Sequence, residues 1–236
     1  MAISTVRALA SPDLAARDKD RLVRVWENIK PNSCPYTYNF HLHTVCSDGQ
    51  LKPEAVMKQA LQVGLQGLAI TDHHTVRGYE AAQSWLEEMR MRKPECLFPH
   101  LWVGVEITAR LLDTNVHILG YAFDPEHPAI APYLQRVEYK DGEEARAERI
   151  ICAIHQAGGL AVLAHPERYR QPAKLLIPTA VGLGIDGVET YYAYRKTNPW
   201  QSTPAQTETV KKLSDRYGLY NTCGTDSHCS NILLRL

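Results

Sequence analysis

The sequence predicts an α/β fold in which seven strands alternate with helices and close into a TIM-like barrel. Short apolar runs alternate with longer amphipathic stretches, which favours parallel strands because every parallel crossover needs a helix. Nearly every predicted strand also ends in a histidine, an aspartate or a glutamate. An open doubly wound sheet fits the alternation too, but a barrel brings more strand ends together at one mouth.

The composition suits one full-sized domain with a short appendage. The 236 residues are 44% hydrophobic, and 26 basic residues balance 26 acidic ones. Without a net charge we expect no binding of duplex DNA, whereas a small phosphorylated substrate is compatible. The sequence contains no transmembrane-length apolar segment and no signal-peptide pattern, so we expect no membrane association. The six cysteines include no Cys-x-x-Cys pair, which predicts reduced thiols and a cytoplasmic location.

Residues 1–35 are predicted to form a helical extension that packs against a barrel domain of residues 36–236. A Ser-Pro pair at residues 11–12 suits a helix start. One helical face then carries the apolar residues Leu14, Leu22, Val25, Trp26 and Ile29. No chemistry is expected in this extension.

The first half of the barrel is predicted between residues 36 and 121. Strands are expected at residues 36–41, 68–70, 101–108 and 115–121, and helices at residues 53–63 and 78–92. Pro53 in the first turn and Gly64 after the last turn mark the ends of the first helix. His41 and His43 are two residues apart on a strand, so their side chains share a face and can chelate one metal ion.

The second half of the barrel repeats the same pattern. Helical regions are expected at residues 129–139, 143–157 and 204–217, and strands at residues 160–164, 186–190 and 220–223. The first of these strands is followed by His165, and the last is followed by Asp226 and His228. No glycine-rich phosphate-binding sequence follows the first strand of the domain, which disfavours a nucleotide-cofactor fold.

The ligand-type residues form an ordered set of short motifs. These are His41-x-His43 with Ser47-Asp48-Gly49, Thr71-Asp72-His73, Gly104-Val105-Glu106, His117, His165-Pro166 and Asp226-x-His228. The set resembles the polymerase and histidinol phosphatase (PHP) domain family of metal-dependent phosphoesterases over most of the chain. The resemblance implies a distorted TIM-like (β/α)7 barrel with a trinuclear metal site at its C-terminal mouth.

The resemblance also implies a ligand set for each ion. The first ion would be held by His41, His43, Glu106 and Asp226, the second by Glu106, His117 and His165, and the third by Asp48, His73 and His228. Glu106 would therefore bridge two ions. Imidazole and carboxylate ligands suit two or three divalent metal ions, with Mn²⁺, Zn²⁺ and Fe²⁺ as the candidates.

Three further residues are predicted to act beside the metals. Asp72 precedes a ligand histidine, and we expect it to serve catalysis by orienting an imidazole. Arg168 lies in a His-Pro-x-Arg-Tyr sequence similar to that of the family's nucleotide-processing members. We expect Arg168 to bind phosphate bidentately, with a plain surface arginine as the alternative. His74 is a candidate substrate contact, and Glu189 is expected to lie near the site without binding a metal.

The predicted function is hydrolysis of a phosphate ester by metal-bound hydroxide. Within this class the resemblance favours a nucleoside 3′,5′-bisphosphate phosphatase or a 5′-to-3′ oligonucleotide exonuclease. The expected partner is therefore a small phosphorylated substrate, either a nucleotide or a short oligonucleotide. Histidinol phosphate phosphatase is the alternative within the class. An amidohydrolase-type C–N hydrolase, whose barrel also begins with His-x-His, and a non-catalytic PHP module are the alternatives outside it.

Overall fold

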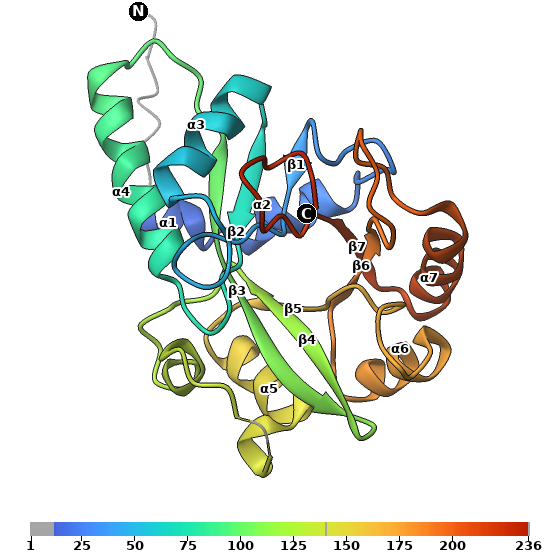
Figure 1. The fold of residues 1–236 in the computed structure, drawn as a ribbon. Coiled ribbons are helices and arrows are strands. Elements are labelled where there is room, and N and C mark those ends of the chain that lie inside the picture. The colour runs from blue at the N-terminus through green and yellow to red at the C-terminus, as the bar shows by residue number, and fades with distance from the viewer. Residues whose placement is uncertain (1–11, 140, 236) are drawn as a thin grey trace, which may run out of the picture.

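The computed structural model describes residues 12–139 and 141–235, and the described strands form one sheet in chain order that curves into a barrel (Figure 1). They are β1 (Tyr38–Asn39), β2 (Gly67–Ile70), β3 (His100–Leu111), β4 (Thr114–Tyr121), β5 (Leu160–Leu163), β6 (Gly187–Tyr191) and β7 (Tyr220–Cys223). The segments that follow β1 and β7 meet: the Asp226 amide donates to the His41 carbonyl at 2.9 Å, and Leu42 bridges Ser227. The predicted barrel-shaped α/β fold is confirmed.

The strands are not all parallel, which corrects the sequence prediction. β4 runs antiparallel to both β3 and β5. Only Leu112 and Asp113 separate β3 from β4, and both have positive φ angles, of 49° and 54°. A two-residue hairpin turn cannot contain the helix that a parallel crossover needs. Because β4 runs backwards, His117 near its beginning lies at the mouth, paired with Thr108 of β3.

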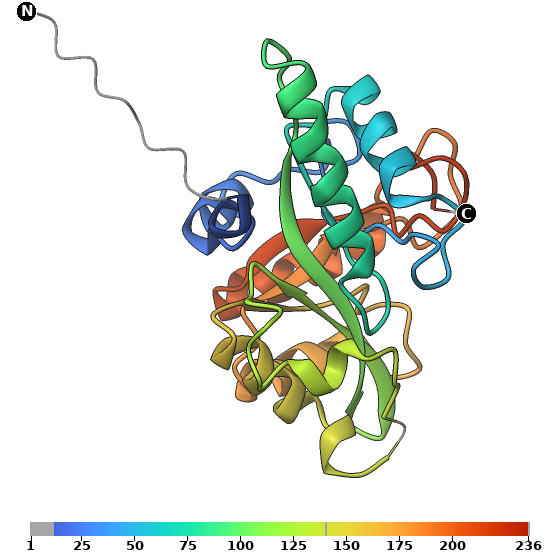
Figure 2. The ribbon, with the colours of Figure 1, turned by 90° about the vertical axis from the view of Figure 1, so that its left-hand side faces the viewer.

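Helices cover the outside of the sheet (Figures 1 and 2). They are α3 (Pro53–Val63), α4 (Arg77–Arg92), α5 (Ala147–Gln156), α6 (Ala173–Gly182) and α7 (Pro204–Tyr217), with short 3₁₀ turns at Ala131–Leu134 and Glu143–Ala145. α3 ends at Gly64, whose φ of 81° explains the glycine there. α6 was not predicted, because Pro178 interrupts a mostly apolar segment without a polar face. None of the described helices is long and apolar enough to cross a membrane.

The described part of the N-terminal extension contains two short helices, α1 (Pro12–Ala16) and α2 (Lys19–Trp26), instead of one continuous helix. The predicted start at residue 11 lies outside the described residues. The carboxylate of Asp18 accepts a bond from the Arg21 amide at 2.8 Å and so begins α2. Trp26 is buried, with its ring 5.3 Å from the Tyr121 ring and 6.1 Å from the Phe40 ring. Figure 2 shows both helices on the side of the sheet away from the C-terminal segment.

A disulfide joins Cys34, before β1, to Cys223, at the end of β7. The prediction of reduced thiols is therefore wrong for this pair, and the predicted cytoplasmic location loses that support. The cysteines are separated by 189 residues in the sequence, yet their Cα atoms lie 6.0 Å apart. Closure of the barrel brings β1 beside β7, and no local sequence pattern reveals that proximity.

Candidate metal centre

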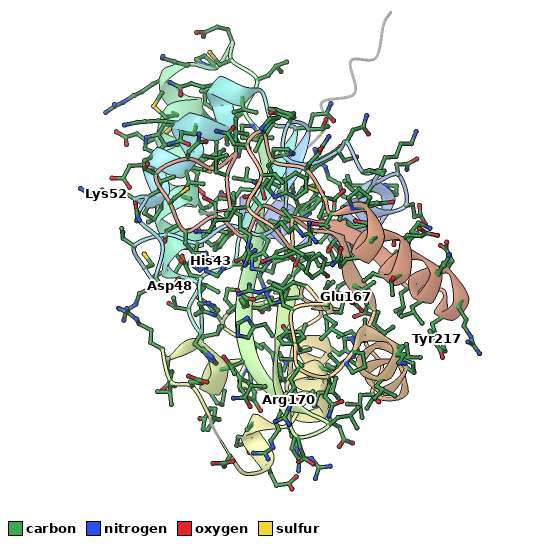
Figure 3. All side chains as sticks on the ribbon, turned by 45° about the vertical axis from the view of Figure 1, so that its right-hand side comes forward. His43, Asp48, Lys52, Glu167, Arg170 and Tyr217 are labelled. Carbon is green, nitrogen blue, oxygen red and sulfur yellow. A yellow bond between two sulfur atoms is a disulfide. The ribbon has the colours of Figure 1, made fainter. Side chains whose placement is uncertain are left out.

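The nine predicted ligands converge at the mouth of the barrel. His41 and His43 follow β1, His73 follows β2, His165 follows β5, and Asp226 and His228 follow β7. Glu106 and His117 come from the β3–β4 hairpin, and Asp48 from the loop after β1. Figure 3 shows His43 and Asp48 in this central region, where the side chains of many separate elements meet.

Glu106 occupies the middle of the cluster and is 1% exposed. Its Oε2 atom lies 3.0 Å from Nε2 of His41 and 3.0 Å from Nε2 of His43. Its Oε1 atom lies 2.7 Å from Nδ1 of His117 and 3.2 Å from Nε2 of His165. The two oxygens face two different pairs of imidazoles, which is the arrangement a bridging carboxylate needs.

The carboxylate of Asp226 also faces two groups of side chains. Its Oδ1 atom lies 3.3 Å from Nε2 of both His41 and His43. Its Oδ2 atom accepts a bond from Nη1 of Arg168 at 2.8 Å and from the Tyr192 hydroxyl at 2.5 Å. Asp226 therefore joins the histidine cluster to an arginine on its other side.

The third predicted group lies at the more exposed rim. Oδ2 of Asp48 is 3.1 Å from Nε2 of His228 and 3.7 Å from Nε2 of His73, and Oδ1 is 3.5 Å from Nδ1 of His43. Burial alone would raise the pKa of Asp48, but its bond to His228 and the nearby imidazoles hold that pKa well below its ordinary value. Asp48 is thus ionised and available to a cation.

The ligand atoms are close enough to share ions. Atoms within 4.8 Å of one another form the sets His41–His43–Glu106–Asp226, His43–Asp48–His73–His228, His73–Glu106–His117 and His41–His165–Glu189. The first set equals the predicted first group, and the second contains the whole third group. His165 differs from the predicted grouping, because its closest set includes Glu189 in addition to its 3.2 Å approach to Glu106.

The charge state of the cluster also fits divalent cations. Burial lowers the pKa of His43, but bonds to Asp226 and Glu106 outweigh it and raise that pKa to about 9. Burial raises the pKa of Glu106, but His41 and His117 hold it well below its ordinary value. The buried carboxylates thus demand positive charge, while Nδ1 of both His43 and His165 lacks a hydrogen-bond partner among the described residues. Divalent ions would satisfy this mixed nitrogen and oxygen set.

Comparison with known proteins assigns the family. The PHP domain model matches residues 39–229, which include all nine residues of the cluster. The chain belongs to the PHP domain family.

Individual relatives carry names from nucleotide chemistry. A 5′-3′ exoribonuclease of Haemophilus influenzae is 24% identical over 260 residues, covering 81% of this chain and 89% of the relative. A 3′,5′-nucleoside bisphosphate phosphatase of Chromobacterium violaceum is 31% identical over 120 residues, covering 51% of this chain and 39% of the relative. A solved Chromobacterium violaceum amidohydrolase structure shares the fold, with a TM-score of 0.68 at 21% identity, covering 85% of this chain and 90% of its own.

Glu189 lies in the metal centre, and its role there could not be predicted from the sequence. Its Oε1 atom lies 2.9 Å from Nδ1 of His41, and its Oε2 atom accepts a bond from the His165 amide at 2.9 Å. It is fully buried in β6. Because Glu189 binds Nδ1 of His41, the Nε2 atom of His41 points at Glu106 and Asp226, so Glu189 orients this ligand. Through the His165 amide, Glu189 also fixes the backbone of a second ligand. The one feature of the sequence that could have indicated this role is an acidic residue within an otherwise apolar strand.

Asp72 has different partners from those predicted. Its carboxylate accepts bonds from the Thr44 amide and hydroxyl, and from the Ser47 hydroxyl, each at 2.7 Å. All hydrogen bonds of this carboxylate to described residues go to this loop, so the expected bond to an imidazole is wrong. Asp72 instead fixes the loop that carries Asp48. A Cβ atom on Gly78 would lie 1.9 Å from its Oδ2 atom, so a glycine is required there.

The two predicted substrate residues line separate cavities beside the PHP centre. Arg168, whose side chain is 39% exposed, lines a cavity of about 400 Å³. His74 lines a second cavity, of about 500 Å³, together with Ser47, Asp48, His73, Thr108, Asn115, His117, Arg136 and Glu138. The Nε2 atom of His74 accepts a bond from the Thr108 amide at 3.2 Å, so this ring also supports β3.

Proposed function

We propose that this PHP domain protein is a metal-dependent phosphoesterase acting on a nucleoside 3′,5′-bisphosphate or on the 5′ end of a short oligonucleotide. The observation that carries the proposal is the cluster around Glu106, in which five imidazoles from four strands or the segments after them approach one buried carboxylate. The names of two relatives, an exoribonuclease and a nucleoside bisphosphate phosphatase, support the nucleotide substrate.

The metal centre would hold two or three divalent ions, with Mn²⁺, Zn²⁺ and Fe²⁺ as the candidates. The residues that would hold them are His41, His43, Asp48, His73, Glu106, His117, His165, Asp226 and His228. Such ions, when bound, acidify water and neutralise the negative charge of the phosphoryl group. Neutral imidazoles and carboxylates, with no thiolate in these sets, favour borderline divalent ions over soft ones.

The remaining residues position the reactants. Arg168 directs a guanidinium into the cavity beside Asp226 and His228, where it binds the phosphoryl group. Asp226 holds Nη1 of Arg168 through its Oδ2 atom, which leaves the other nitrogens of the guanidinium for the substrate. Asp48 lines both cavities. The cavity lined by His74 adjoins the Arg168 cavity at Asp48, and it can accommodate the organic part of the substrate.

Neither of the two serines beside the described ligand residues is arranged as a nucleophile. The Ser47 hydroxyl donates to Asp72, and the Ser227 hydroxyl donates to the Asn231 carbonyl at 2.9 Å. Neither serine has a hydrogen bond to a histidine among the described residues, so neither has the imidazole base that usually activates a serine nucleophile. Water is therefore the nucleophile that attacks phosphorus.

A substrate screen tests the proposal. Metal-loaded protein is incubated with a nucleoside 3′,5′-bisphosphate, a short RNA, histidinol phosphate and an N-acyl amino acid, and product release is measured. We expect the highest kcat/KM on one of the two nucleotide substrates, and loss of that activity in Glu106→Gln. Preference for histidinol phosphate would replace the nucleotide assignment. Hydrolysis of the amide alone, or of none of these compounds by protein containing its metals, would refute the phosphoesterase proposal.

A further inference from the structure

Arg235 lies against the metal centre without belonging to any of its ligand sets. Its guanidinium carbon is 5.1 Å from the centroid of the Tyr192 ring, and its Nη1 atom donates to the Ala193 carbonyl at 3.2 Å. Its Nε atom is 3.8 Å from Oδ2 of Asp226, too far for a hydrogen bond, and has no hydrogen-bond partner among the described residues. The side chain is held in place, and within the part of the chain that the structure describes only its Nη1 atom has a hydrogen-bond acceptor.

Arg235 and Arg168 line the same cavity of about 400 Å³. Its other lining residues are Asp48, Gln50, Asp226 and His228. Two guanidinium groups and residues of the metal centre therefore line one cavity. A tetrahedral oxyanion that enters it can meet both the guanidinium donors and the predicted metal ligands.

The balance of charge in this cavity favours an anion. Oδ2 of Asp226 is the carboxylate oxygen that faces both arginines, at 2.8 Å from Arg168 and 3.8 Å from Arg235. Its Oδ1 atom faces the histidines instead, as do both oxygens of Asp48. Two permanent cations thus share one carboxylate oxygen, and both guanidinium groups line the cavity.

We propose that Arg235 is a second phosphate-binding residue, which acts with Arg168 on the phosphoryl group that enters this cavity. The inference rests on the proposed phosphoesterase function, which it extends by naming a residue that recognises the substrate. A planar guanidinium can lie over the Tyr192 ring and still offer parallel donors to two phosphate oxygens. A lysine at position 235 would keep the charge but lose that geometry.

Binding of inorganic phosphate to the metal-loaded protein tests this role without requiring turnover. Affinity is measured by calorimetry at constant ionic strength for wild type, Arg235→Met and Arg235→Lys, with metal content and melting temperature recorded for each. Arg170→Met is the matched control, because Arg170 is exposed in the same loop as Arg168 and does not line the cavity (Figure 3).

We expect Arg235→Met to weaken phosphate binding by about tenfold or more, the loss typical of a charge-assisted contact. Arg235→Lys should recover part of the affinity, and Arg170→Met should stay within about twofold of wild type. Unchanged phosphate affinity in Arg235→Met would overturn the proposal. Loss of metal or of folding in both Arg235 variants would also overturn it, because Arg235 would then serve to support Asp226.

The two proposals fail separately in these experiments. Wild-type protein that releases phosphate from esters, but binds phosphate independently of Arg235, would keep the phosphoesterase function and reject the inference. Wild-type protein that hydrolyses no ester, but binds phosphate through Arg235, would reject the function and leave a phosphate-binding site.

Discussion

Replacement of Glu106 by glutamine should lower metal binding and kcat/KM far more than replacement of His228 by alanine. Glu106 is buried and lies within 3.2 Å of four imidazole nitrogens, so both of its oxygens are engaged at the centre of the cluster. His228 is 22% exposed and approaches Asp48 and Asp226 from the rim. The first variant perturbs two predicted ion sites, and the second perturbs one.

The expected losses differ by at least an order of magnitude. Removing one unit charge from beside a cation about 4 Å away costs on the order of 4 kcal/mol at an effective dielectric of about 20. That corresponds to a loss of about 1,000-fold in kcat/KM for Glu106→Gln, since about 1.4 kcal/mol equals a factor of ten. Water can replace the His228 imidazole, and we expect a loss of about 10- to 100-fold there, similar to the loss of a residue that orients a ligand.

The assay combines metal analysis with phosphate release. Both variants and the matched surface control Glu95→Gln are loaded with metal, exchanged into metal-free buffer and measured for bound metal and for kcat/KM. Circular dichroism checks that each variant is folded. Glu106→Gln that retains all its metal and its rate would refute the bridging role, and so would a larger loss in His228→Ala.

Three further outcomes are expected. Hydrolysis of a chiral thiophosphate ester in labelled water should invert the configuration at phosphorus, because water attacks directly. Retention of configuration, or a trapped phosphoenzyme, would contradict this. Gly78→Ala should lower stability by about 1–3 kcal/mol, because its Cβ would collide with Asp72, and an unchanged melting temperature would show that the space exists. The Asp186 bond raises the pKa of His155 above 6.5, so this pair stabilises the fold at acidic pH and loses that effect as pH rises through the raised pKa. The melting-temperature difference between wild type and His155→Gln should shrink accordingly, and a difference independent of pH would exclude the charged pair.

Elements with strong local chemistry could be predicted from the sequence. Pro53 and Gly64 bound α3 as expected, since a proline suits the first turn and a glycine the left-handed residue after the last. α7 begins at Pro204 and ends before Gly218 for the same reasons. The nine ligand-type residues were predicted because their ordered motifs resemble those of the PHP family, and most of them follow a strand.

Features that depend on tertiary proximity could not be predicted. The β3–β4 hairpin turns at Leu112 and Asp113, without the glycine that usually marks such a turn, so the antiparallel strand was missed. The position of Glu189 in a strand could be predicted, but its partners His41 and His165 could not, because they depend on how the segments after β1 and β5 meet β6 in the folded chain. Arg235 has no motif at all, because its role depends on how the segment after β7 passes over Tyr192.

Stoichiometric metal reconstitution tests most directly whether this cluster is a catalytic centre. Chelated protein is titrated with Mn²⁺ or Zn²⁺, and bound metal, melting temperature and phosphate release are followed on the same samples. Metal binding to the folded state should raise the melting temperature and restore activity in proportion to occupancy, up to two or three ions per chain. Full activity in metal-free protein, or a melting temperature unaffected by verified removal of the metal, would contradict the assignment.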